Sequence, residues 1–164
     1  MCTVGKTKER KTSKSTRSNA TTVCKFDKTK QISVEYQPIG FKAKKKALGN
    51  DIPYGKVWAP GGKPMTMFTN TTVVVDGKDI PVGAHILSVI PDQNAWTMIV
   101  NRNTDISGKY DDQQDLARIH MNFGELSSPE SQFSVDFAHV APDQCNIRLD
   151  PQKTRAWVTI EEMK

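Results

Sequence analysis

Hydrophobic and polar residues alternate along short segments over most of this chain. In one such segment Ile32, Val34 and Tyr36 are separated by Ser33 and Glu35. This period of two gives one apolar and one polar face, which is the pattern of a half-buried β-strand. Comparable segments, separated by Gly, Pro, Asn and Asp, lie around Cys24 and at residues 32–36, 54–58, 65–75, 83–90, 96–100, 119–123, 133–137, 146–149 and 156–160. We therefore predict an all-β fold, an antiparallel β-sandwich or flattened barrel of about eight to ten strands with at most one short helix.

Four segments add detail to this prediction. Residues 83–90 are largely apolar in both alternating sets of positions, which indicates a central strand covered on both faces. The dipeptide Asp76-Gly77 is the strongest signal for a tight hairpin turn. The lysines within residues 41–48 favour an edge strand or a loop, because lysine discourages pairing with another sheet edge. Residues 111–118 are the one segment in which we expect a helical turn or two.

The net charge of +5 is concentrated at one end of the chain. Residues 1–19 contain six basic residues and one acidic residue, whereas residues 20–164 contain 17 of each kind. The leader also has almost no large apolar side chains, so we expect residues 1–19 to be a disordered basic leader and residues 20–164 to be a single β-sandwich domain. The balanced body argues against a nucleic-acid-binding face on the folded domain, although the leader itself could contact nucleic acid or anionic lipid.

The three cysteines, Cys2, Cys24 and Cys145, show neither metal-ligand nor redox-motif spacing. We expect Cys24 and Cys145 to be two independent buried thiols, with a Cys24–Cys145 disulfide in an oxidising compartment as the alternative. Cys2 is followed by a Ser/Thr/Lys-rich stretch, as is the lipidated cysteine of a processed lipoprotein; an ordinary reduced cysteine is the other interpretation. We therefore expect membrane contact only if Cys2 is lipidated, because no apolar run is long enough for a transmembrane helix.

No local pattern in the sequence encodes a catalytic or metal site. The histidines His85, His120 and His139 share no i, i+2 or i, i+4 spacing, although a site assembled across strands would be invisible at this level. We expect His85 to be buried, His120 to face solvent and His139 to cap the core at a strand end. The acidic residues within 105–115 have the composition of a calcium loop but not its spacing. We predict no metal site, no cofactor and no catalytic residue, with a hydrolase-like or metal-dependent enzyme built across strands as the alternative.

Aromatic residues occur next to a Pro/Gly loop. Tyr54, Lys56 and Trp58 alternate with smaller residues just before this loop, which contains Lys63. An aromatic face can stack on a sugar ring or an apolar ligand, and glycine permits close approach. The same aromatic residues also fit a plug that closes one end of the sandwich. We take Tyr54, Lys56, Trp58 and Lys63 as the candidate ligand-binding residues.

Four blocks of sequence carry a resemblance to a known family: IPYGKVW, DGKDIPVGAHILSVIP, AWTMIVN and LSSPESQFSVDF. Over residues 23–160 the chain resembles the bacterial family catalogued as Domain of Unknown Function twenty-nine eleven. Members of that family look like extracytoplasmic proteins, so the resemblance implies a secreted, periplasmic or lipid-anchored β domain. At residues 59–66 the chain departs from the family pattern, because the family's Arg and Asn are absent, and His85 stands where an aromatic residue is more usual. A degenerate or purely structural copy is therefore an alternative.

Pattern, charge and resemblance together predict the function in outline. We expect a non-enzymatic extracytoplasmic domain with a binding or structural role in the bacterial envelope. Its partner would be a small ligand, a glycan or another envelope protein, contacted at the 54–64 loop and its neighbours.

Overall fold

The protein is built almost entirely from β-strands. A computed structural model describes residues 19–104 and 110–164, so the predicted leader, with Cys2, lies outside the described residues apart from Asn19. The strands are β2 (Ala20–Lys25), β3 (Gln31–Tyr36), β4 (Met65–Thr69), β5 (Val73–Val75), β6 (Lys78–Ile80), β7 (Gly83–Ile90), β8 (Trp96–Asn101), β9 (Asp115–Glu125), β10 (Ser134–Ala141), β11 (Gln144–Asp150) and β12 (Thr154–Glu162). Two 3-10 turns, η2 (Pro60–Gly62) and η3 (Asp112–Gln114), are the helical elements of the described residues. The all-β prediction is confirmed.

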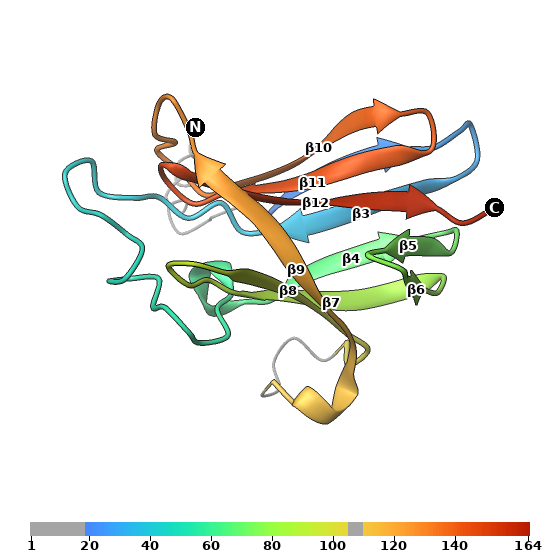
Figure 1. Ribbon diagram of the computed structural model, residues 1–164, viewed down its shortest axis with the longest axis horizontal. Coiled ribbons are helices and arrows are strands. Elements are labelled where there is room, and N and C mark those ends of the chain that lie inside the picture. Colours follow the sequence, from blue (N-terminus) through green and yellow to red (C-terminus); the bar gives the residue numbers. More distant parts are fainter. Residues whose placement is uncertain (1–18, 105–109) are drawn as a thin grey trace, which may run out of the picture.

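The strands form one antiparallel sheet that curls into a nearly closed, flattened barrel (Figure 1). Its strand order is β10-β11-β12-β9-β8-β7-β4-β3-β2, and the β5–β6 hairpin pairs with the end of β12. The long diagonal strand β9 joins the two layers, because residues 115–121 pair with β8 and residues 122–125 pair with β12. The predicted sandwich or flattened barrel is confirmed, with β9 as the element that belongs to both layers.

Inward-facing residues of the two layers form the core. On β7, Leu87 and Val89 face this core, whereas Ile86 and Ser88 are buried on the opposite face, as predicted for a strand covered on both sides. The Asp76-Gly77 turn is also confirmed: both residues have positive φ, 51° and 74°, and they connect β5 to β6.

Three predicted elements differ in the structure. The single strand expected at 65–75 is divided into β4 and β5, because the Asn70 side chain binds Gln31 N (2.7 Å) and Thr29 O (2.8 Å) and turns the chain toward the β2–β3 connection. Residues 54–58 are a loop with one bridge, between Trp58 and Val89, and Gly55 interrupts the expected strand with a φ of 75°. The helical segment expected at 111–118 is only the short turn η3, after which β9 begins.

The barrel closes where the two ends of the strand order meet. β2 and β10 are in contact but share no strand pairing among the described residues. Instead, a disulfide joins Cys24 on β2 to Cys145 on β11, with the two Cα atoms 6.6 Å apart, and His139 Nε2 lies 3.0 Å from Lys25 O. The expectation of two independent thiols is therefore wrong. Alternation places both cysteines on the inner faces of the layers, and only the curvature of the sheet brings those faces together.

Candidate functional site

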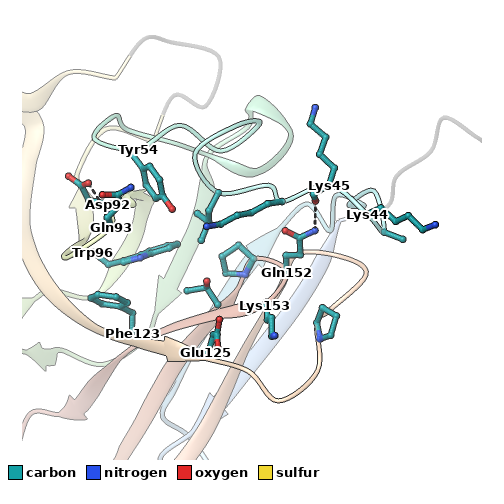
Figure 2. Close-up of a pocket in the computed structure, with 16 residues that line it drawn as sticks. Lys44, Lys45, Tyr54, Asp92, Gln93, Trp96, Phe123, Glu125, Gln152 and Lys153 are labelled. Atoms are coloured by element: carbon teal, nitrogen blue, oxygen red, sulfur yellow. Dashed lines mark hydrogen bonds between the residues drawn. The ribbon is translucent and has the colours of Figure 1, made fainter.

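A cavity of about 500 Å³ lies at one end of the barrel, and this volume is typical of small-molecule sites (Figure 2). Four segments that are distant in sequence surround it: the 43–54 loop, residues 92–96 between β7 and β8, residues 123–129 at the end of β9, and residues 151–154 between β11 and β12. The lining residues are Ala43, Lys44, Lys45, Lys46, Leu48, Tyr54, Asp92, Gln93, Trp96, Phe123, Glu125, Pro129, Pro151, Gln152, Lys153 and Thr154. The site therefore depends on the completed fold.

Rows of inward-facing side chains continue beyond the core and reach this cavity. On β9 the core residue Met121 is followed at a period of two by Phe123 and Glu125. Trp96, on β8, pairs with Met121 and is 1% exposed, so its ring closes the inner end of the cavity. Thr154, on β12, pairs with Glu125 on β9. Phe123, at 40% exposure, therefore presents its ring to the cavity and to solvent.

Tyr54 completes an aromatic cluster with Trp96 and Phe123. Figure 2 shows the three rings at the same end of the cavity, with the Tyr54 hydroxyl directed toward its interior. Gly49 lies against the Tyr54 ring: its φ is +84°, and a Cβ at that position would be only 2.9 Å from Tyr54 Cε2. Glycine is thus required for the loop to pass this close to the ring.

Gln152 holds the lysine-rich part of the 43–54 loop in place. Its Nε2 donates to Lys45 O (2.7 Å), and its Oε1 accepts a hydrogen bond from Ala47 N (2.8 Å). The turn that carries Gln152 is itself fixed, because Arg155 donates two hydrogen bonds to the buried Asp150 carboxylate, both 2.8 Å long. Loop and turn therefore form one connected wall of the cavity.

The two ends of the cavity differ in chemistry. Asp92 and Gln93 lie beside the aromatic cluster, and the Gln93 backbone amide donates to Asp92 Oδ1 (2.8 Å). The Glu125 carboxylate accepts no hydrogen bond from the described residues, which leaves it available to a ligand. At the other end, Figure 2 shows the side chains of Lys44 and Lys45 extending away from the aromatic cluster. The cavity wall therefore combines aromatic surface with carboxylate, amide and lysine side chains, and of its four lysines Lys44 and Lys45 extend away from the aromatic cluster.

The structure separates the four ligand-binding residues predicted from sequence. Tyr54 lines the cavity, whereas Lys56, Trp58 and Lys63 do not. Lys56 and Lys63 are exposed on the surface. Trp58 is half-buried and packs edge-on against the core residue Phe133, with ring centroids 5.3 Å apart. A binding role for these four residues stays a prediction.

Sequence reasoning missed most of the cavity. Alternation within residues 119–123 predicts Phe123 on the apolar face of a strand, and residues 96–100 predict Trp96 at a strand start, without indicating a cavity at either residue. Continuing the alternation of β9 past Phe123 would have pointed to Glu125 as a residue on the same face. No local signal connects these residues with Asp92 or Gln152, because the pairing of β8, β9 and β12 is what brings them together.

A second polar cluster lies at the opposite end of β9. Asp115 accepts hydrogen bonds from Tyr110 Oη (2.6 Å), Arg118 Nε (2.8 Å) and Asn101 Nδ2 (2.9 Å). Burial alone would raise the pKa of Asp115, but these hydrogen bonds outweigh it and hold the pKa below its ordinary value. Burial and the neighbouring carboxylate raise the pKa of Tyr110 to about 12. Part of the predicted acidic loop, residues 105–109, lies outside the described residues.

The three histidines lie in different environments. His85 is buried, as expected, and its Nε2 donates to Pro81 O (2.8 Å), whereas His120 is exposed, as expected. His139 follows Val135 and Phe137 along the inward row of β10 and reaches the end of the barrel seam. Among the described residues, one group of three side chains could together bind a metal ion, and it consists of His139, Cys24 and Cys145.

Among the described residues, no helix combines the length and apolarity that a membrane crossing requires.

Comparison with known proteins places the chain in a family without a described activity. No curated protein and no solved structure matches the chain. A family model matches residues 17–160, which is most of the chain. The chain therefore belongs to the family described as Protein of unknown function (DUF2911).

Proposed function

We propose that this protein is a non-enzymatic binding domain that holds a neutral sugar ring of a glycan in the cavity at the end of the barrel. The observation that carries the proposal is the aromatic cluster of Tyr54, Trp96 and Phe123 beside Asp92 and Gln93. A sugar ring has an apolar C–H face that stacks on an aromatic ring and hydroxyl groups that donate to carboxylates and amides. The cavity offers both kinds of contact at one end.

The carboxylate of Asp92 favours a neutral ligand over an acidic one beside the aromatic cluster. Lys44 and Lys45 extend away from the aromatic cluster, and Lys45 Nζ lies 3.5 Å from Asp51 Oδ1 on the surface. A bound acidic group next to the aromatic cluster would instead meet the carboxylate of Asp92. Like charges at short range are unfavourable, so a neutral sugar fits this end of the cavity better.

The Cys24–Cys145 disulfide supports the extracytoplasmic part of this proposal. Structural disulfides persist in secreted and periplasmic proteins and are rare in the reducing cytosol. A glycan of the cell envelope or of the surroundings is the corresponding class of ligand.

Binding to an array of neutral and acidic oligosaccharides tests the proposal, followed by calorimetric titration of the best binder. Phe123→Ala should weaken binding at least about ten-fold, because the stacking surface is removed. Phe68→Ala is the matched control: Phe68 on β4 is 46% exposed, close to the 40% of Phe123, and it lies outside the cavity. Absence of any neutral glycan binder, or an equal effect of the two substitutions, would contradict the proposal.

A glycoside hydrolase is the second candidate, since Asp92 and Glu125 both line the cavity and paired carboxylates are the machinery of that reaction. Release of a chromogenic leaving group from aryl glycosides, lost in both Asp92→Asn and Glu125→Gln, would favour the enzyme. Binding without turnover would favour the binding domain.

A further inference from the structure

The barrel seam brings together three side chains that chemistry associates with zinc. Cys24 comes from β2, His139 from β10 and Cys145 from β11. His139 and Cys145 are directly opposite in the β10–β11 ladder, so their side chains emerge on the same face of the sheet. Cys24 approaches from the other layer, and one donor atom from each residue lies within 4.8 Å of the others.

The distance between two of these donors is close to that of a tetrahedral zinc site. Cys24 Sγ and His139 Nε2 are 3.8 Å apart. With Zn–S of about 2.3 Å and Zn–N of about 2.0–2.1 Å, tetrahedral geometry gives a sulfur–nitrogen separation of about 3.5 Å. The histidine ring needs only a small adjustment, at the expense of its 3.0 Å hydrogen bond to Lys25 O. The two sulfur atoms, bonded to each other in the oxidised protein, must separate to about 3.8 Å after reduction to bind one zinc ion.

A structural disulfide uses only the two cysteines and does not account for the third donor beside them, the imidazole of His139. We propose that Cys24, Cys145 and His139 form a zinc site in the reduced protein, which the disulfide replaces on oxidation. Two thiolates and one imidazole are a common zinc donor set, and they leave a fourth position for water or another ligand. His139 is exposed, so an ion can reach the buried sulfur atoms from that side.

The exchange between the two states balances with a dithiol reagent, its oxidised form and zinc as the reactants. A dithiol reductant supplies two electrons and two protons, becomes a disulfide itself, and converts the Cys24–Cys145 bond into two thiols. Zinc then displaces the two thiol protons and binds the neutral imidazole of His139. Thiol–disulfide exchange with an oxidised dithiol takes the two electrons back: the Cys24–Cys145 bond re-forms, the reagent becomes a dithiol by taking two protons from solvent, and the zinc ion is released. This site is independent of the cavity and of the glycan proposal.

The test uses the full chain with Cys2→Ser, so that Cys24 and Cys145 are the only thiols. The protein is reduced with a dithiol, transferred without oxygen into buffer lacking reductant, and titrated with Co²⁺ and then Zn²⁺. We expect one metal ion per chain, a thiolate-to-cobalt charge-transfer absorption, and its loss when zinc displaces cobalt. The oxidised protein should bind neither ion at this site.

Two histidine variants identify the third ligand. His139→Ala should weaken zinc binding at least about ten-fold while the disulfide still forms in the oxidised protein. His120→Ala, at an exposed position outside the cluster, should bind zinc as tightly as the parent chain. Equal affinities of the two variants, or no metal uptake by the reduced parent, would overturn the proposal. So would a reduced chain that unfolds, by circular dichroism, and is not refolded by zinc.

Discussion

Trp58 lies outside the residues that line the cavity and packs against the core. Its ring meets Phe133 edge-on at an interplanar angle of 86°, and its backbone forms a bridge with Val89. We expect Trp58→Ala to lower the free energy of unfolding by about 3 kcal/mol, because a large aromatic side chain is removed from packed surroundings. Urea denaturation followed by circular dichroism measures this loss. A loss under about 1 kcal/mol together with abolished ligand binding would instead assign Trp58 to the ligand.

The Asp115 cluster makes stability depend on pH in a defined direction. The pKa of Asp115 is lowered in the folded protein, so its ionised form stabilises the fold at pH values above the unfolded pKa of about 3.9. This contribution is lost as the pH falls through the lower, folded pKa. We expect Asp115→Asn to be less stable than the parent by about 1 kcal/mol at pH 7, since charge-assisted hydrogen bonds to Tyr110 and Arg118 are weakened.

Urea denaturation at a series of pH values checks this prediction. The difference in unfolding free energy between the parent and Asp115→Asn should be constant above about pH 5 and should shrink below pH 3.9. Asp76→Asn is the control, because Asp76 is exposed in the β5–β6 turn and asparagine also tolerates its φ of 51°. A parent–Asp115→Asn difference that does not change with pH would show that the ionisation of Asp115 is not its source.

At the scale of elements, the position of the 43–54 loop depends on hydrogen bonds from one side chain of a distant turn, Gln152. Gln152 has a φ of 69°, which glycine adopts without strain, so Gln152→Gly removes the side-chain hydrogen bonds to Lys45 and Ala47 but keeps the turn geometry. We expect amide exchange of residues 42–47 to become at least about ten-fold faster, with β3 and β7 unchanged. Hydrogen–deuterium exchange with peptide resolution measures both. Unchanged exchange in the loop would mean that other contacts hold it.

Whole-molecule features account for what the sequence could and could not predict. The strand class, the hairpin at Asp76-Gly77 and the double-sided burial of β7 follow from local alternation and turn chemistry, and all are seen in the structure. The division of β9 between two layers is not local, because it depends on which strands pair with each half. For the same reason the cavity could not be predicted, and the Cys24–Cys145 disulfide could be named only as an alternative: each consists of residues that only the closed sheet brings together.

The closure of the barrel yields a prediction about the compartment in which the protein works. The disulfide spans 121 residues and connects β2, at one end of the strand order, to β11, next to the other end, so the entropy lost by the unfolded chain corresponds to about 3–5 kcal/mol of stability. If the protein is extracytoplasmic, rapid acid quenching and alkylation of cells that make it naturally should leave Cys24 and Cys145 unlabelled until a reductant is added. Mass spectrometry of the digested protein reads the label at each cysteine separately. Full labelling of both cysteines before reduction would contradict an oxidising compartment, and the reduced, metal-binding form would then be the one to isolate from those cells.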